Sequence, residues 1–392
     1  MAIITSEQLY TRPAPELYKQ GEIQGFHAID PSSVGIDPDN HPALVWSLEI
    51  ADPYVDSYSA SERFGVISSE NAADATARLR RILGKWQRKP GTAYYDENGD
   101  EQDKQEWGDP SLTKGFFNAL GSEALADWRE LVPTASALRY LSDPTMNTLT
   151  DRAGEVHPID DTAHKWMSLS TDAVGIRARG TVLSELVKAY VQDHDLGENV
   201  NWMSVACGTA LPTIQGALAA GIDHKTSLLL VDPDKNAMSS TVEIADELGF
   251  QGEIQQERMN VFKPEKVADL KERLIAEGKR PKLVDIMGIL EYTGENLGVD
   301  SVEFLKMYYD ILEPGGRLLL GQMREDRPRL DFTMGVVGWP YVQTRTINDL
   351  MGLLKEAGIP LDKAQVYLPK DGVYTVCCVD KPHDSEMLTA AI

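Results

Sequence analysis

The chain has 392 residues, which is long enough for two domains or for one large domain with additions. Hydrophobic residues make up 42% of it and charged residues 25%, as in globular proteins that bury a core. The formal net charge of −23 argues against a broad nucleic-acid-binding surface, because Lys and Arg provide most contacts to phosphates. A DNA or RNA partner is therefore not expected.

The cysteine spacing and the N-terminal residues argue against a metal-binding, secreted or membrane protein. Cys207, Cys377 and Cys378 show no spacing typical of a metal site, so no metal is expected. The first 20 residues lack a basic segment followed by an apolar one, and no run reaches the about 20 apolar residues of a membrane span. We therefore expect a cytoplasmic protein without a membrane span, and a homodimer is left open.

The N-terminal part of the chain is predicted to be mainly helical, with frequent turn-forming residues up to about residue 60. An acid-rich segment over 89–110 indicates an exposed loop, and the regular pattern is lost again between 141 and 164. Apolar residues spaced by three and four positions predict four helices, over 69–86, 112–120, 122–131 and 135–141.

A long amphipathic segment over 171–194 predicts a helix that leads into the first strand of an α/β region. Such a helix carries Arg177 and Arg179 close to the turn that follows that strand. Two interpretations of these arginines stay open: they contact a substrate or cofactor, or they form structural ion pairs.

From residue 201 onward, apolar runs alternate with segments rich in helix-forming residues. This alternation predicts a doubly wound, mostly parallel sheet with helices on both faces. Two final strands are joined by the turn 369–372, which is short enough for an antiparallel hairpin. The predicted strands are 202–206, 228–231, 254–262, 283–290, 317–322, 364–368 and 374–379, and the helices are 214–220, 237–248, 264–277, 302–312 and 346–357.

The segment over 201–234 has the pattern of a nucleoside-binding βαβ unit. An apolar run breaks at Gly208, a helix follows, and a second apolar run ends on Asp232. A tight turn brings the backbone close to a ligand, and the acid accepts hydrogen bonds from ribose hydroxyls. NAD(P) is disfavoured, because Ala206, Gly208 and Leu211 stand where a G-x-G-x-x-G turn needs glycines.

Four segments over about 172–380 resemble the class I S-adenosylmethionine-dependent methyltransferases. In chain order they read VACGTALP, LLLVDPDKNAM, VDIMGILEYT and LEPGGRLLL. The resemblance implies a Rossmann-like α/β fold: a doubly wound, mostly parallel seven-stranded sheet that ends in an antiparallel hairpin. It places a methyltransferase domain that binds S-adenosylmethionine at 166–392, behind a mainly helical substrate or lid region at 1–165.

Three residues depart from the family pattern at the glycine-rich turn. Ser204 replaces an acid near the end of the first strand, and Ala206 and Ala210 stand where glycine is common. Because alanine is disfavoured at positive φ, we expect both alanines to have negative φ. These departures keep an alternative open, in which the chain is a non-catalytic nucleoside-binding sensor or partner subunit.

The resemblance also implies the residues that bind the cofactor. Gly208 lets the backbone approach it, Asp232 holds the ribose hydroxyls, and Asn260 faces the adenine amine. The full set of expected cofactor-binding residues is Ala206, Cys207, Gly208, Thr209, Asp232, Pro233, Asp234, Asn260, Val261 and Gly288.

Methyl transfer depends mainly on alignment of the acceptor with the methyl group and on exclusion of water. A hydroxyl acceptor needs a general base, whereas a carboxylate does not. Candidate catalytic residues are Glu291, Tyr292 and His164, and candidate substrate contacts are Arg177, Arg179, Trp339 and Tyr341. The apolar segment 323–344 favours a small-molecule or lipid-like acceptor and O-methylation of a hydroxyl or carboxylate. The segment LSTDAVGIRARG also resembles bacterial methyltransferases that esterify hydroxy-fatty acids.

Overall fold

The computed structural model describes residues 26–66, 68, 70, 110–126, 135–150, 155–194, 196–197, 199–294, 297–337 and 342–383. The helix predicted over 69–86 and the loop predicted over 89–110 lie almost entirely outside these residues. The candidate substrate residues Trp339 and Tyr341 lie outside them as well.

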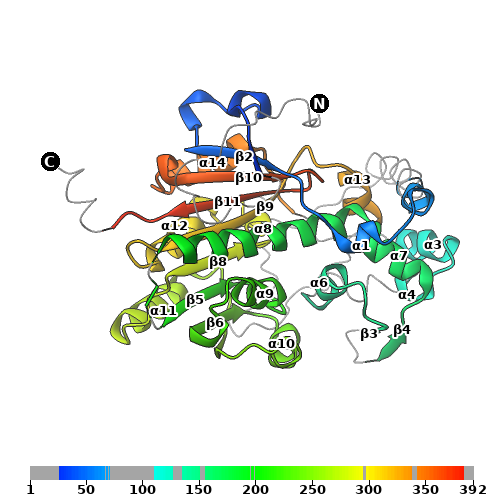
Figure 1. Cartoon of the computed structure of the whole chain (residues 1–392), viewed down its shortest axis with the longest axis horizontal. Helices are drawn as coiled ribbons and strands as arrows, with labels where there is room; N and C mark the ends of the chain where they lie inside the picture. Colours follow the sequence, from blue (N-terminus) through cyan, green and yellow to red (C-terminus); the bar gives the residue numbers. More distant parts are fainter. Residues whose placement is uncertain are drawn as a thin grey trace.

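A nine-stranded sheet forms the centre of the molecule, in the order β1-β2-β10-β11-β9-β8-β5-β6-β7 (Figure 1). Strands β5 to β9 are parallel to their neighbours, whereas β11 runs antiparallel to both β9 and β10. The predicted terminal hairpin is thereby confirmed. The strands are β1 (Phe26–Ala28), β2 (Leu44–Leu48), β5 (Val200–Val205), β6 (Thr226–Asp232), β7 (Glu253–Arg258), β8 (Leu283–Met287), β9 (Arg317–Met323), β10 (Ala364–Pro369) and β11 (Tyr374–Asp380).

The sheet has two strands more than the seven that we predicted. β1 and β2 come from the N-terminal part of the chain, and β2 pairs in parallel with β10. Both are short, and β2 joins the sheet through β10, more than 300 residues away along the chain, so no local pattern predicts their place in the sheet. Pairing of β2 also covers the edge of β10, which would otherwise expose unpaired backbone groups.

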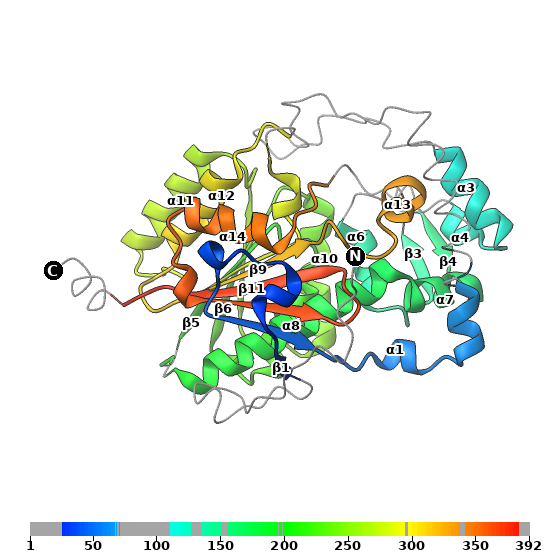
Figure 2. The same cartoon turned by 90° about the horizontal axis from the view of Figure 1, so that it is seen from above.

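Helices cover both faces of the sheet, as the α/β alternation predicted (Figure 2). On one face, α8 (Thr171–Asp193), α9 (Leu211–Ala219) and α10 (Lys235–Leu248) share an apolar cluster with Trp202. On the other face, α11 (Pro264–Ala276), α12 (Ser301–Ile311) and α14 (Ile347–Glu356) share a cluster with Met203. Since neighbouring residues of β5 point to opposite faces, the strand is buried on both sides.

A third apolar cluster joins the N-terminal helices to the end of β9. It includes Trp166 of α7, Ile176 of α8, Met323 of β9 and Phe332 of α13. The sequence did not predict α7, which begins after Asp160, whose side chain accepts a hydrogen bond from Ala163 N (2.8 Å). The remaining elements are α1 (Pro53–Asp56), α3 (Pro110–Ala119), α4 (Glu123–Ala126), α6 (Ala135–Ser142), β3 (Thr148–Thr150), β4 (Val156–Pro158), α7 (Asp161–Leu169) and α13 (Leu330–Phe332).

Within the described part of the chain, no helix combines the length and the apolar character that crossing a membrane requires.

Candidate active site

The turn between β5 and α9 is built from three residues in the left-handed region. Ala206 has φ 50°, Gly208 has φ 56° and Ala210 has φ 54°. Our expectation of negative φ at the two alanines was wrong. Ala206 N donates to Val231 O (2.7 Å), so the turn begins directly at the end of the β5–β6 pairing. The turn therefore has positive φ at three positions with a glycine at only one of them, Gly208.

Asp232 ends β6 and ties this turn to the sheet. Its Oδ2 accepts a hydrogen bond from Gly208 N and its Oδ1 accepts one from Asp234 N, both at 2.7 Å. Burial raises the pKa of Asp232 to about 7, against the lowering effect of these two bonds. A carboxylate has about four acceptor positions, so two remain for the hydroxyls of a ribose. Asp232 and Gly208 thus fit the nucleoside of S-adenosylmethionine.

An acid lies directly beside Ser204 on the neighbouring strand, although Ser204 itself replaces the acid of the family pattern. Asp285 of β8 is buried and accepts hydrogen bonds from Trp202 Nε1 (2.7 Å), Ser204 Oγ (2.9 Å) and Thr213 Oγ1 (3.3 Å). Burial raises its pKa to about 6. An acid within the apolar run VDIMGIL was the available signal for Asp285, which our site prediction missed.

The residues predicted around the adenine have different environments. Asn260 follows β7, is 2% exposed, and its Oδ1 accepts from Phe262 N (3.0 Å). Val261 has no exposed surface, and its carbonyl accepts from Tyr308 Oη (2.8 Å). Val261 is therefore part of the α12-side core beneath the ligand edge of the sheet. Of the other predicted cofactor residues, Thr209 and Pro233 are buried, and Cys207, Asp234 and Gly288 are half-buried.

Arg177 has a structural role in this fold. Its Nε and Nη2 contact Asp52 Oδ2 (2.9 and 2.8 Å), and its Nη1 donates to the carbonyls of Leu141 (2.9 Å) and Met167 (3.0 Å). A further bond goes to Ser168 O. Four hydrogen bonds and one ion pair thereby engage all three nitrogens of the guanidinium. Of the two interpretations left open, the structural one applies to Arg177.

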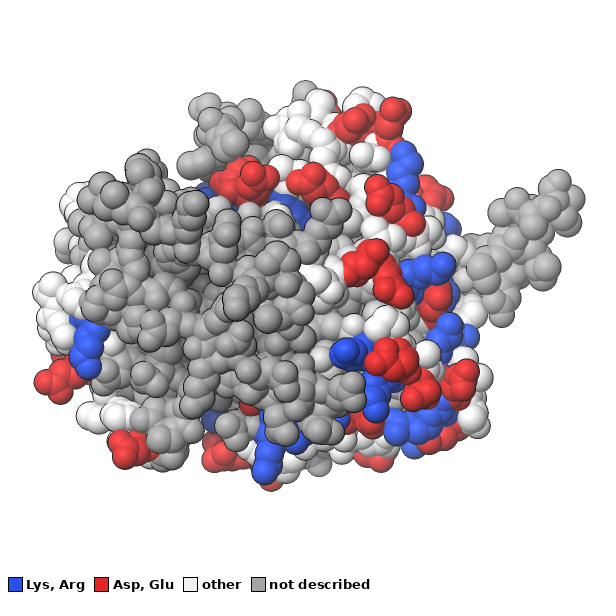
Figure 3. Space-filling view, turned by 180° about the vertical axis from the view of Figure 1, so that it is seen from behind, with Lys and Arg blue, Asp and Glu red and all other residues white. Residues whose placement is uncertain are grey.

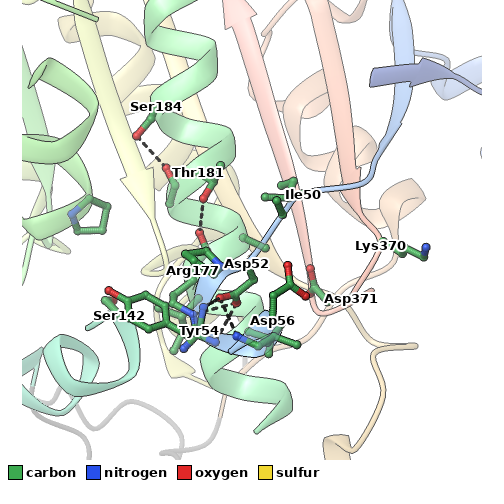
Figure 4. A pocket seen from close by; sticks show the side chains of 18 of the residues that line it. Ile50, Asp52, Tyr54, Asp56, Ser142, Arg177, Thr181, Ser184, Lys370 and Asp371 are labelled. Atoms are coloured by element: carbon green, nitrogen blue, oxygen red, sulfur yellow. Dashed lines mark hydrogen bonds and ion pairs between the residues drawn. The ribbon is translucent and has the colours of Figure 1, made fainter. Parts of the chain in front are cut away.

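Arg177 also lines a cleft of about 450 Å³ between α8, the segment around Asp52 and the start of α9 (Figure 4). Figure 4 shows Arg177 and Tyr54 next to Asp52, with Lys370 and Asp371 at the far side. Two positions along a helix correspond to a rotation of about 200°, so Arg179 points away from this cleft.

Arg179 points toward the C-terminal ends of β8 and β9. It is 5% exposed, and its guanidinium lies over the ring of Tyr374, 4.4 Å from the centroid. A Cβ placed on Gly288 would lie 2.5 Å from Arg179 Nη1, and one on Gly321 would lie 2.9 Å from Arg179 Cδ. Arg179 therefore occupies space that two glycines leave free at the ends of two adjacent strands.

Glu291 lies in a short 3₁₀ turn after β8, Leu290–Tyr292. Its side chain is 2% exposed, and its Oε1 accepts from Met323 N of β9 (2.9 Å). Burial raises the pKa of Glu291, whereas the charge of Arg179 lowers it. The structure thus brings Glu291, Arg179 and Gly288 together at one edge of the sheet.

Arg345 holds the loop that carries Glu291. It is buried and donates to the carbonyls of Leu290 (2.8 Å) and Thr293 (2.7 Å) and to Gln322 Oε1 (2.8 Å). Arg345 lies directly after the apolar segment 323–344, and nothing in its sequence context indicated that it holds the loop of Glu291.

His164 and Tyr292 complete the set of predicted catalytic residues. The Nδ1 of His164 lies 2.8 Å from the carbonyl of Pro144, within the layer formed by α6 and α7. Tyr292 is half-buried against the third apolar cluster. Neither residue has the combination of burial and unused hydrogen-bonding capacity that distinguishes Glu291.

A family model described as "Putative methyltransferase" matches residues 164–381, more than half of the chain. The chain belongs to this family. The matched range contains α8, the strands β5 to β11 and all four class I motifs. The methyltransferase therefore acts on S-adenosylmethionine as an enzyme of class I, and the non-catalytic alternative is set aside.

Solved structures with a similar fold have low sequence identity to the methyltransferase. A possible exported protein from Bordetella parapertussis has a TM-score of 0.50 at 15% identity, covering 83% of this chain and 99% of that chain. The S-adenosylmethionine-dependent methyltransferase SibL has a TM-score of 0.42 at 15% identity, covering 69% and 73%. Human N-acetylserotonin methyltransferase in complex with SAM has a TM-score of 0.35 at 15% identity, covering 66% and 70%. At 15% identity the comparison with the Bordetella protein concerns the fold alone, and none of the curated proteins matches.

Proposed function

We propose that the enzyme methylates an oxygen of a small-molecule or lipid-like acceptor at the C-terminal edge of β5, β8 and β9. The observation that carries this proposal is Glu291, a buried carboxyl group beside the ligand edge with one oxygen held by Met323 N. An acid whose pKa is raised by burial is suited to accept a proton from a hydroxyl near neutral pH. His164 and Tyr292, the other catalytic candidates, have no part in this scheme.

The cofactor assignments belong to the same proposal. Asp232 accepts from the ribose hydroxyls, and Gly208 and its turn neighbours Ala206, Cys207 and Thr209 allow close approach of the backbone. Pro233 and Asp234 lie beside the adenosine, with Asn260 toward the adenine. Gly288 lies at the methyl-donor end. When bound, S-adenosylmethionine supplies an activated methyl group, and the chain positions the acceptor and excludes water.

The N-terminal part, residues 1–165, is proposed as the substrate and lid region over the methyltransferase domain at 166–392. Its described helices share the third apolar cluster with Met323 and Phe332, close to the loop of Glu291. An apolar surround of this kind favours a small or lipophilic acceptor over a polymer.

Calorimetry with Asp232→Asn tests the cofactor assignment. The ionised carboxylate is the form that accepts ribose hydroxyls, and its pKa of about 7 means that it gains ionisation between pH 6 and 8. We expect S-adenosylmethionine to bind wild type more tightly at pH 8 than at pH 6. Below pH 7, binding should release a proton from the Asp232 carboxyl group. The amide variant should bind about 10- to 100-fold more weakly, because it loses a charge-assisted hydrogen bond. It should also lose this pH dependence.

Asp269→Asn, at an exposed position on α11, is the matched control and should leave binding unchanged. Unchanged affinity in Asp232→Asn would contradict the ribose assignment. The acceptor class is tested with methyl-labelled S-adenosylmethionine and a cell extract: label in protein or nucleic acid, rather than in molecules below about 1 kDa, would contradict it.

A further inference from the structure

Two arginines on the same helix differ in how their donors are used. Each guanidinium nitrogen of Arg177 has a partner. Arg179 is only 5% exposed, yet it forms no hydrogen bond or ion pair with any described residue. A guanidinium stays charged at all ordinary pH values and offers five donors. Burying such a group without partners is costly. A ligand that supplies acceptors therefore stabilises this arrangement.

The surroundings of Arg179 are shaped to hold it there. The glycines at 288 and 321 provide its space, and Tyr374 provides an aromatic face at 4.4 Å. The nearby Asp285 interacts with Arg179 electrostatically but forms no hydrogen bond or ion pair with it in the described part of the structure, and its oxygens accept from three other side chains. The guanidinium is fixed in place while its donors remain available, and this geometry matches the bidentate binding of a carboxylate.

Glu291 provides a second unused group at the same edge. Its Oε2 is buried and has no hydrogen-bond partner among the described residues, whereas Oε1 is held by Met323 N. Because Arg179 lowers the pKa of Glu291, the two side chains interact electrostatically, although they form no ion pair in the described part of the structure. The site therefore offers one buried cation and one buried proton acceptor.

The position of these groups favours the acceptor over the methyl donor as their ligand. Asp232, which fits the ribose, is on β6, whereas Glu291 is held to β9, three strand spacings away in the order β9-β8-β5-β6. At about 4.8 Å per spacing this separation is roughly 14 Å. The acceptor approaches the methyl group from the side opposite the sulfur, farther from the ribose.

We propose that the acceptor is a hydroxy acid, whose carboxylate is bound by Arg179 and whose hydroxyl donates to Glu291 Oε2. This inference rests on the proposed function and names its substrate class. Glu291 accepts the hydroxyl proton, and the oxygen uses the freed electron pair to form the O–CH₃ bond. The S–CH₃ bond breaks with its electrons remaining on sulfur, so S-adenosylhomocysteine and a methyl ether acid are released. The proton on Glu291 then passes to solvent.

Binding to the complex with S-adenosylhomocysteine tests the carboxylate contact without requiring turnover. Two matched series serve as probes: 2-hydroxybenzoate, benzoate and phenol, and 3-hydroxyoctanoate, octanoate and 1-octanol. In at least one series, we expect the two acids to bind wild type and the alcohol to bind at least tenfold more weakly. Arg179→Met should weaken acid binding about 10- to 100-fold. Arg179→Lys should weaken it by less, because lysine keeps the positive charge but cannot bind a carboxylate through two parallel N–H donors.

Arg177→Met is the matched control, since it is the same substitution two positions away on α8. It removes a complete set of hydrogen bonds, so it should lower thermal stability without changing the preference for acids over alcohols. Arg179→Met should leave the stability of the free protein unchanged or raise it, because it removes a buried charge without partners. If Arg179 had a structural role, Arg179→Met would instead lower the stability of the free protein.

Glu291→Gln tests the proton transfer. With labelled S-adenosylmethionine and the hydroxy acids, we expect turnover to fall about 100- to 10,000-fold while KM changes less than threefold, with loss of the acid limb of the pH profile. The product of wild type should be stable to alkali, as an ether is. A product that releases methanol in alkali is a methyl ester, which overturns the inference.

Two binding results overturn the inference and leave the proposed function intact. The first is that no acid in either series binds, or that all bind Arg179→Met as tightly as wild type. The second is that Arg179→Met weakens the binding of S-adenosylmethionine at least tenfold, while decarboxylated S-adenosylmethionine binds wild type and Arg179→Met equally. Arg179 would then hold the carboxylate of the methyl donor. Failure of wild type to bind S-adenosylmethionine at all would contradict the proposed function itself.

Discussion

At the scale of single residues, the cofactor turn stores backbone strain in Ala206 and Ala210. Both are alanines in the left-handed region, with φ 50° and 54°. This conformation costs an L-residue about 1–2 kcal/mol. Ala210 is fully buried and Ala206 is half-buried, so their methyl groups also contribute packing. The two alanines therefore lower the stability of the backbone, and the packing of their methyl groups fixes the shape of the turn.

Replacing Ala206 with glycine tests that account. We expect Ala206→Gly to raise the free energy of unfolding by about 0.5–1 kcal/mol, because glycine adopts positive φ without a steric penalty. Ala268→Gly, at an exposed position inside α11, is the control and should lower it by about 0.5–1 kcal/mol. Urea unfolding measures both. A loss of stability in Ala206→Gly would mean that packing of the methyl group outweighs the strain.

The contrast between Arg177 and Arg179 shows what residue-level sequence analysis could and could not predict. Both arginines were predicted to lie close to the turn after β5; Arg177 lines a cleft with Pro212 at the start of α9, and Arg179 lies against Gly288 after β8. Their roles differ because one faces Asp52 and three backbone carbonyls and the other faces Gly288 and Gly321. Asp52, Gly288 and Gly321 come from segments more than 100 residues away along the chain, so the local pattern could not separate the two roles.

At the scale of elements, α8 packs against β11 through a contact that only glycine permits. A Cβ on Gly175 would lie 2.5 to 2.9 Å from three atoms of Val373. This close approach brings Arg179, one turn farther along α8, over Tyr374 next to Val373. The glycine at 175 therefore helps to position the guanidinium.

Gly175→Ala should lower the free energy of unfolding by about 1–3 kcal/mol, because the gain in helix propensity does not offset the overlap with Val373. Gly352→Ala in α14 is the control: nothing lies within 4 Å of its Cβ position, so it should stabilise by about 0.5–1 kcal/mol. In the double variant with Val373→Ala, the two losses should sum to more than the measured loss. Additive losses would argue against a direct contact.

Most elements from residue 171 onward were predicted from apolar periodicity, because both faces of the sheet are buried. Helix α8, for example, was predicted over 171–194 and is found at Thr171–Asp193. The strands β1 and β2 were missed because their pairing depends on β10, at the other end of the chain. Short helices such as α7 were missed because tertiary packing, rather than a long periodic pattern, stabilises them.

At the scale of the whole molecule, buried carboxyl groups control how stability responds to pH. Burial raises the pKa of Glu70 to about 7, of Asp232 to about 7 and of Asp285 to about 6. In the unfolded chain these groups titrate near 4. The folded state therefore binds more protons than the unfolded state between about pH 4 and 7, and its stability falls as pH rises through that window.

We expect the free energy of unfolding of the free protein to fall by roughly 6 kcal/mol from pH 5 to pH 8 if these three groups act independently. The net charge of −23 acts in the same direction, although acidic and basic side chains are interspersed on the described part of the face in Figure 3. Urea unfolding at constant ionic strength measures the trend, and Glu70→Gln should reduce its slope. A stability that rises from pH 5 to pH 8 would contradict this account.

The pairing of β2 with β10 also has a consequence for the order of events during synthesis. The ion pair between Glu49 and Lys370 beside this pairing joins residues 321 positions apart. Residues 44–48 leave the ribosome long before their partner strand exists, so the pairing of β2 with β10 cannot form until residues 364–369 have been made. Until then the hydrogen-bonding groups of β2 are available to other chains, which makes the interval before chain completion the period of greatest exposure to aggregation.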